Sequence, residues 1–193
     1  MINFEQYLAE RSVPGKANII KRKVTEAELR QMVKDKDSII ADVDVSEITN
    51  MKELFKNSDF GGSWTADLSD WDTSNVTHMF SMFEGCTKLT KVELPHTENV
   101  TNMFSMFIGC TGLTKVELPH TENVEDMRWM FYGCRSLQQD FSKWDISNVR
   151  SKSDMFKGCT KMEKAKIEGK KYYPKGYEEW LNLKNTWQKK RLR

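Results

Sequence analysis

Hydrophobic and polar positions recur along this chain at a regular interval. One copy of the recurring unit, Asn99–Leu118, reads NVTNMFSMFIGCTGLTKVEL, and Asn75–Leu94 differs from it at three positions. Shorter copies begin at Asn123 and Asn148, and a degenerate copy begins at Ile48. The cysteines mark the interval, because Cys86, Cys110, Cys134 and Cys159 occupy the same place in successive copies, roughly 24 residues apart. A period of this size is typical of solenoids, in which each unit buries its apolar side against its neighbours.

Within a copy, the hydrophobic spacing changes from helical to extended. Four apolar positions follow the i, i+3, i+6, i+7 spacing of one helix face, and Gly109 follows as a helix stop. Polar residues before this segment are expected to cap its open N–H groups. Apolar residues separated by charged ones then predict a short strand. The residues are Val100, Met103, Met106 and Phe107 for the helix, Thr97, Asn99 and Thr101 for its cap, and Leu113, Val116 and Leu118 for the strand.

These copies predict an α/β repeat solenoid of about five strand–helix units, with helical caps at its two ends. We divide the chain into an N-terminal helical cap (1–40), the repeat solenoid (41–168) and a C-terminal helical cap with a basic end (169–193). In the last of these, Tyr177–Leu192 is predicted to form a helix that packs on the final copy.

The N-terminal cap is predicted to combine helices with a strand. Helices are expected at Phe4–Arg11 and Glu26–Lys34, and a strand at Ser38–Val45. Thr25 and Glu28 have the spacing of a capping box at the start of the second helix. The apolar face of that helix is formed by Leu29, Met32 and Val33.

Composition fits an elongated molecule with much surface. Only 38% of the 193 residues are hydrophobic and 30% are charged, and the formal net charge is +2. A charge so close to zero gives no strong indication of nucleic-acid binding by the molecule as a whole. The segment Met1–Ile20 lacks the apolar run of a signal peptide, and no transmembrane stretch follows. We therefore expect a cytoplasmic protein.

The residue pattern contains no set of groups typical of an active site. A repeat places identical residues in columns, whereas catalysis needs different groups that converge on one point. The four cysteines are expected to be buried, reduced and in one column, although neighbouring turns could also bring two sulfurs within bonding distance. His96 and His120 occupy equivalent positions near Glu93 and Glu117, which fits either duplicated surface residues or a metal site. We expect no enzyme activity, no cofactor and no metal ion.

Two surfaces are candidates for binding a partner. Along the strands, Lys and Glu alternate and form columns, which fits either a solvated face or the binding surface of a solenoid. Beside the apolar stripe, aromatic residues share one position of the copy with Arg128, and they either pack between helices or form an exposed strip. The candidate residues are Lys91, Glu93, His96, Lys115, Glu117, His120, Phe80, Phe104 and Trp129. The stripe itself, which is predicted to be core, comprises Met79, Met82, Phe83, Met103, Met106, Phe107, Met127, Met130 and Phe131.

The motif S-N-V-T-x-M-x-x-M-F-x-G-C-x-x-L, found at residues 74–89, resembles the BspA-type leucine-rich repeat of bacteria. The lead-ins VTEAELRQMV and DVDVSEITNMKELF also resemble the opening of such arrays, so the similarity covers residues 25–168. It implies a right-handed, leucine-rich-repeat-like solenoid. Many members of that family are surface proteins thought to bind host or bacterial partners.

The function expected from the sequence is non-enzymatic binding of a partner protein by a chain that is a monomer on its own. A sharper hypothesis is a small inhibitor or immunity-type protein that blocks a bacterial enzyme, for example a phage-borne anti-defence protein. The alternatives are a fragment of a bacterial surface adhesin and a nucleic-acid-binding protein. The last would use the basic C-terminus, where Lys189, Lys190, Arg191 and Arg193 cluster.

Overall fold

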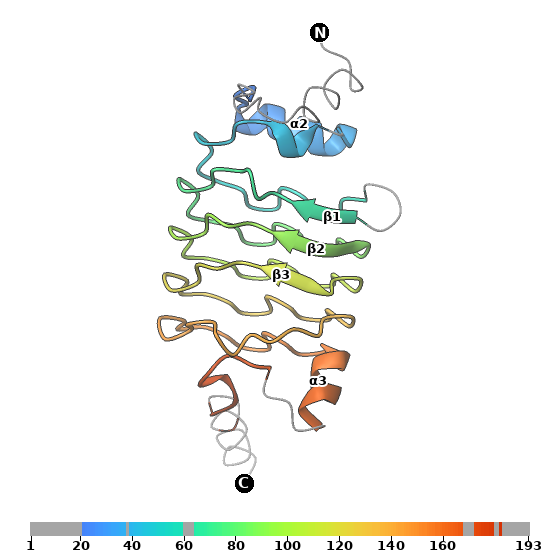
Figure 1. The fold of residues 1–193 in the computed structure, drawn as a ribbon, viewed down its shortest axis with the longest axis vertical. Helices are drawn as coiled ribbons and strands as arrows, with labels where there is room; N and C mark the ends of the chain where they lie inside the picture. Colours follow the sequence, from blue (N-terminus) through green and yellow to red (C-terminus); the bar gives the residue numbers. More distant parts are fainter. Residues whose placement is uncertain (1–20, 38, 60–63, 168–171, 180–181, 183–193) are drawn as a thin grey trace, which may run out of the picture.

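The computed structural model describes residues 21–37, 39–59, 64–167, 172–179 and 182. Copies of the repeat lie one above another between a helix at the N-terminal end and a helix at the C-terminal end (Figure 1). The elements are α2 (Glu26–Asp35), the 3-10 helix η1 (Ile40–Asp42), β1 (Trp64–Asp67), β2 (Leu89–Glu93), β3 (Lys115–Glu117) and α3 (Thr160–Ile167). The three strands form one parallel sheet in the order β1-β2-β3.

The predicted solenoid of about five strand–helix units, leucine-rich-repeat-like and right-handed, is wrong. The described residues contain one open sheet of three strands and three short helices, and none of these helices occupies the predicted place within a copy. Residues 101–109, where a helix was expected after Val100, are turns joined to the neighbouring copies by backbone hydrogen bonds.

The backbone of these turns explains why no helix forms. Ser105 has a φ of 55°, in the left-handed region, whereas every residue of an α-helix needs a negative φ. The N–H groups also alternate in their partners: that of Ser105 donates to Arg128 in the next copy at 2.9 Å, and that of Met106 donates back to Met103 at 3.2 Å. The same alternation links residues 50–57, 78–85, 102–109, 126–133 and 151–158, which we call the turn ladder.

The residues that were expected to cap a helix join neighbouring copies instead. The Asn99 amide donates to the Ser74 carbonyl at 2.7 Å, and the Thr97 hydroxyl donates to the His120 carbonyl at 2.7 Å. The asparagine bond recurs with the same length at Asn75, Asn123 and Asn148. These side chains therefore fix the register between copies.

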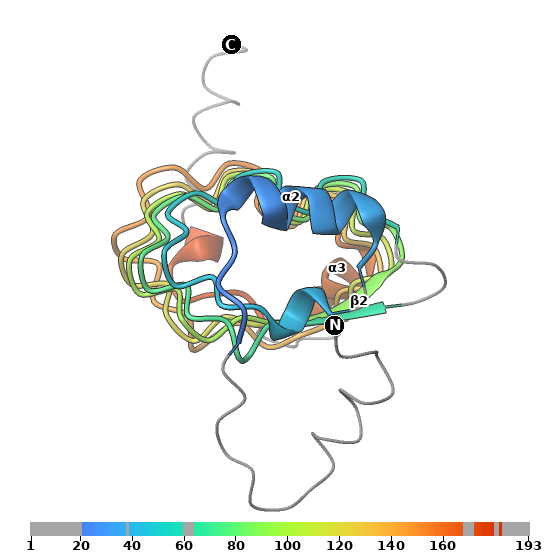
Figure 2. The ribbon, with the colours of Figure 1, turned by 90° about the horizontal axis from the view of Figure 1, so that it is seen from above.

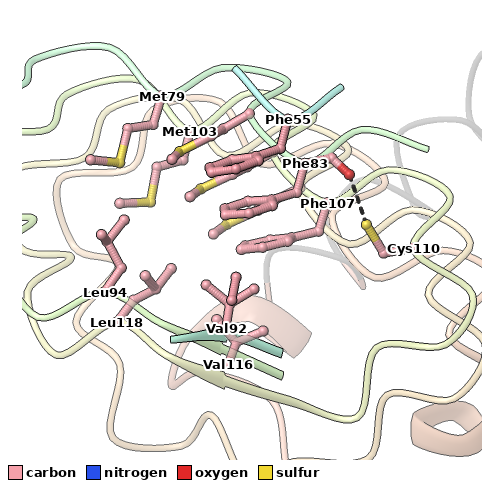
Figure 3. Packing of buried hydrophobic residues seen from close by; sticks show 14 of the residues in the cluster. Phe55, Met79, Phe83, Val92, Leu94, Met103, Phe107, Cys110, Val116 and Leu118 are labelled. Carbon is pink, nitrogen blue, oxygen red and sulfur yellow. Dashed lines mark hydrogen bonds between the residues drawn. The ribbon is translucent and has the colours of Figure 1, made fainter. Parts of the chain in front are cut away.

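The core lies between the turn ladder and the sheet (Figures 2 and 3). As predicted, the methionine and phenylalanine stripe is buried throughout. Phe83 and Phe107 stack with ring centroids 5.4 Å apart and planes 6° apart, and they face Val92 and Val116 of the strands (Figure 3). The stack extends through Phe55, Phe83, Phe107, Phe131 and Phe156.

The described part of the N-terminal segment agrees with one prediction and contradicts another. Helix α2 begins with the expected capping box, in which Thr25 and Glu28 bond to each other's backbone N–H groups, and its predicted apolar face is buried. The strand predicted at Ser38–Val45 is wrong. Ser38 lies outside the described residues, Ile40–Asp42 form η1, and Asp44 makes only an isolated bridge with Lys23. The Asp37 carboxylate accepts the Ile39 N–H at 3.1 Å, which favours a turn at this point.

Several predictions fall wholly or partly outside the described residues. They are the helix at Phe4–Arg11, most of the helix at Tyr177–Leu192 and the basic cluster at the C-terminus. The division into 1–40, 41–168 and 169–193 stays a prediction. At the described C-terminal end, Phe156 meets Tyr173 and Tyr177 edge-on at 5.2 Å, so aromatic rings cover the last copy.

Candidate functional site

The charged residues of the strands neutralise one another. Lys91 and Lys115 are neighbours in the sheet, as are Glu93 and Glu117. The Lys91 ammonium lies 2.7 Å from the Glu93 carboxylate and 3.4 Å from that of Glu117, and Lys115 lies 2.5 Å from Glu117. The hydrogen bond with Glu93 raises the pKa of Lys91, and the hydrogen bond with Lys115 lowers the pKa of Glu117. The like-charge columns are therefore compensated within the sheet, which favours a solvated face.

The two equivalent histidines lie at the exposed edge of successive copies. His120 is 3.3 Å from the Glu122 carboxylate, and His96 is 3.9 Å from that of Glu98. Their backbone carbonyls accept hydrogen bonds from the threonine hydroxyls of the preceding copy. No group of three or more His, Cys, Asp or Glu side chains in the described part of the chain could hold a metal ion.

Apolar side chains gather on the outer side of the turn ladder. Trp129 is 41% exposed and Tyr132 is 38% exposed, and Phe104 lies half-buried with its ring centroid 5.4 Å from that of Trp129. This arrangement excludes packing between helices, because the copies have none here. We call the outer apolar residues the aromatic strip: Phe80, Phe104, Ile108, Trp129 and Tyr132. The sequence pattern did not single out Ile108 and Tyr132, although both precede the glycine of their copy.

Cations lie over the rings of the aromatic strip. The Arg128 guanidinium is 5.1 Å from the Phe104 centroid, and hydrogen bonds of 2.6 to 3.1 Å hold it on the Asp126 carboxylate. Lys52 lies 5.5 Å from the Phe80 centroid, and Lys157 lies 5.8 Å from that of Tyr132. Each of these distances is within the range of about 6 Å at which the ring quadrupole attracts a cation.

Trp129 occupies a backbone position that does not suit a bulky residue. Its φ is 56°, in the left-handed region, which costs a non-glycine residue roughly 1–2 kcal/mol. The other copies place smaller or charged residues in the same conformation, namely Glu53, Ser81, Ser105 and Asp154. An exposed tryptophan at this position is not required by the fold, since four other residues satisfy the same turn.

A separate cavity of about 280 Å³ lies at the C-terminal end of the described stack. Phe156, Tyr173 and Tyr177 form its apolar walls, and Glu163 and Lys166 are among the charged residues that line it. Burial raises the pKa of Tyr177 to about 12. The Gly158 N–H donates to the Glu163 carboxylate at 3.0 Å. In earlier copies the equivalent glycine N–H donates to a carbonyl of the next copy, so Glu163 takes the place of that carbonyl at the described end of the stack.

No helix among the described residues has the length and apolar character needed to cross a membrane. A family model described as "Mycoplasma protein of unknown function, DUF285" matches residues 27–117 and 89–169. No curated protein matches the chain, and no solved structure matches it.

Proposed function

The chain belongs to the DUF285 family, and on that premise we propose that it is a non-enzymatic protein that binds a partner protein through the aromatic strip. The motif at residues 74–89 supports a finer proposal, that the chain is of the BspA type. The family description assigns no activity, so the argument for function rests on the surface itself.

Trp129 is the observation that carries this proposal. Tryptophan, tyrosine and arginine are enriched among the residues that dominate binding energy at protein interfaces. Trp129, Tyr132 and Arg128 lie within one turn of the ladder, and the tryptophan is exposed at a left-handed position that Ser or Glu fills elsewhere. A large aromatic side chain that stays 41% exposed, where other copies place Ser, Glu or Asp, is best explained by a contact outside the chain.

The sharper form of the proposal is a small inhibitor or immunity-type protein that occludes a bacterial enzyme. A surface that supplies binding energy without positioned acid–base groups acts by blocking or scaffolding its partner. The alternative that this chain is a fragment of a bacterial surface adhesin stays open, and such a fragment would use the same surface to bind a different partner. Nucleic-acid binding depends on Lys189, Lys190, Arg191 and Arg193, which lie outside the described residues.

The test compares capture of a partner by the wild-type chain and by Trp129→Ser. Serine stands at the equivalent position in two other copies, at Ser81 and Ser105, so the variant is expected to keep the fold. Tagged proteins are incubated with lysate of the source organism, with and without nuclease, and recovered proteins are identified by mass spectrometry. We expect one stoichiometric partner whose recovery falls about tenfold or more with the variant.

A second variant tests the sheet face. Reversing all four charges, at Lys91, Glu93, Lys115 and Glu117, preserves their ion pairs and is expected to leave folding and capture unchanged. Capture that survives Trp129→Ser but is lost on charge reversal would move the interface to the sheet and overturn the proposal. Capture that disappears with nuclease would favour nucleic acid.

A further inference from the structure

The aromatic strip has a cation at each end. Lys52 occupies the first copy of the turn ladder and Lys157 the last, while the apolar residues Phe80, Phe104 and Ile108 lie in copies between them. Three copies lie between those of the two lysines, so four spacings of about 4.8 Å each separate the lysines by about 19 Å along the stack.

These two lysines differ from the other cations beside the strip. Arg128 is neutralised by Asp126 at 2.6 Å, and Lys56 is neutralised by Glu53 at 3.0 Å and Glu84 at 3.3 Å. Lys52 and Lys157 are exposed, and the side-chain contact that the structure records for each is with an aromatic ring. An aromatic ring contacts only one side of a lysine ammonium group. The other N–H donors of that ammonium group are therefore open to an incoming acceptor.

Building on the proposed function, we propose that the aromatic strip binds a linear segment of the partner that has an apolar centre and a carboxylate at each end. The apolar centre packs on Trp129 and Phe104, and the terminal carboxylates pair with Lys52 and Lys157. The distance of about 19 Å along the stack sets a minimum of about six extended residues or about thirteen helical ones. The span is longer than this minimum because Lys52 takes the place of Phe104 in its copy, whereas Lys157 takes the place of Ile108. Nucleic acid fits this surface less well, because phosphates recur along its whole length while the middle of the strip is apolar.

The experiment uses a phage-displayed library of random peptides, each about 16 residues long so that either conformation spans the strip. The library is panned against the full chain, and enriched peptides are resynthesised for affinity measurement. We expect them to have aromatic or aliphatic residues in the centre and Asp or Glu toward both ends. Their affinity is expected to fall about tenfold or more for Trp129→Ser and for the double variant Lys52→Glu/Lys157→Glu. A matched control, Lys34→Glu/Lys164→Glu, makes the same charge change at exposed lysines of α2 and α3 and is expected to leave affinity unchanged.

The outcomes separate this inference from the proposed function. Peptides that lose affinity with Trp129→Ser but not with the Lys52/Lys157 variant would overturn the charge pairing and leave the strip as the interface. Peptides without acidic ends, or no enrichment at all, would overturn the inference, while lysate capture with Trp129→Ser still decides the proposed function. Peptides that bind all variants equally would count against both.

Discussion

The Gln139 side chain pairs with both backbone groups of Val116. The Val116 N–H donates to the Gln139 amide oxygen at 2.7 Å, and the Gln139 amide nitrogen donates to the Val116 carbonyl at 2.7 Å. One side chain thereby takes the place of the peptide group of a fourth strand. The free edge of β3 is closed at this point, which protects it from pairing with another chain.

Replacing Gln139 with alanine is expected to destabilise the protein and open this edge. Two partly buried backbone groups lose their partner, which costs about 1–3 kcal/mol. The exposed strand edge is then expected to cause self-association that increases with concentration. Urea unfolding measures the first effect, and sedimentation velocity over a range of concentrations measures the second.

Gln138→Ala is the matched control, because Gln138 is the exposed neighbour of the same residue type. We expect it to unfold and sediment like the wild type. If Gln139→Ala behaves like this control in both measurements, the side-chain amide does not close the sheet.

The end of the sheet could have been predicted from the sequence. Leu89 and Leu113 are each followed by TKVEL, whereas Leu137 is followed by QQDFS, so the strand pattern stops after two clear copies. Burial of the methionine and phenylalanine stripe was also predictable, because a repeated apolar spacing indicates which side faces the core. These features depend on local sequence.

The turn ladder could not be predicted in this way. Apolar residues at i, i+3, i+6 and i+7 fit a helix, but they also fit consecutive turns that point the same side chains inward. The choice depends on hydrogen bonds to another copy, such as that from Ser81 to Phe104, and on the left-handed φ of Ser81. The exposure of Trp129 follows from the same geometry. The sequence marked it as a candidate, but only the structure places it outside the core.

Gly109 allows a test of the left-handed positions. Its φ is 72°, and a Cβ added there would lie 3.9 Å from the Gly85 Cα, at ordinary contact distance. Gly109→Ala is therefore expected to lose about 1–2 kcal/mol through backbone strain alone. Gly109→Asn is expected to lose less, since asparagine tolerates this conformation better. Thermal or urea unfolding should show that stability decreases from the wild type to Gly109→Asn and further to Gly109→Ala. Equal stability of Gly109→Ala and the wild type would contradict the left-handed conformation of Gly109.

Phe107 tests the contribution of the ring stack. It is fully buried between Phe83 and Phe131, with both centroids 5.4 Å away and planes 6° and 2° apart. Phe107→Ala is expected to lower the free energy of unfolding by about 3–5 kcal/mol, because it removes a large buried side chain and leaves a cavity. Phe104→Ala, at a half-buried position on the outer side, is the control and is expected to cost less. Similar losses for the two variants would contradict the core assignment.

The cysteine column predicts how stability changes at high pH. Each thiol donates to the carbonyl of a phenylalanine in the preceding copy, as Cys86 does to Phe55 at 2.9 Å and Cys110 to Phe83 at 3.0 Å. Burial raises the pKa of Cys86 and of Cys159 from 9.0 to about 12. Because the folded values exceed the unfolded ones, the stability from protonated thiols is complete below pH 9 and is lost as pH rises toward 12. Urea midpoints are therefore expected to fall between pH 8 and pH 10.5.

Titrating lysines and tyrosines also affect stability in this pH window, so a variant must isolate the thiols. The double variant Cys86→Ala/Cys159→Ala is expected to have a lower urea midpoint than the wild type at pH 8, because two buried sulfurs are removed. Its urea midpoint is expected to fall less than that of the wild type between pH 8 and pH 10.5. Thiol titration of the unfolded, unreduced wild type is expected to find four free thiols per chain. A count of two or fewer would indicate a disulfide in the column, and an equal pH slope in the variant would assign the alkaline loss to other groups.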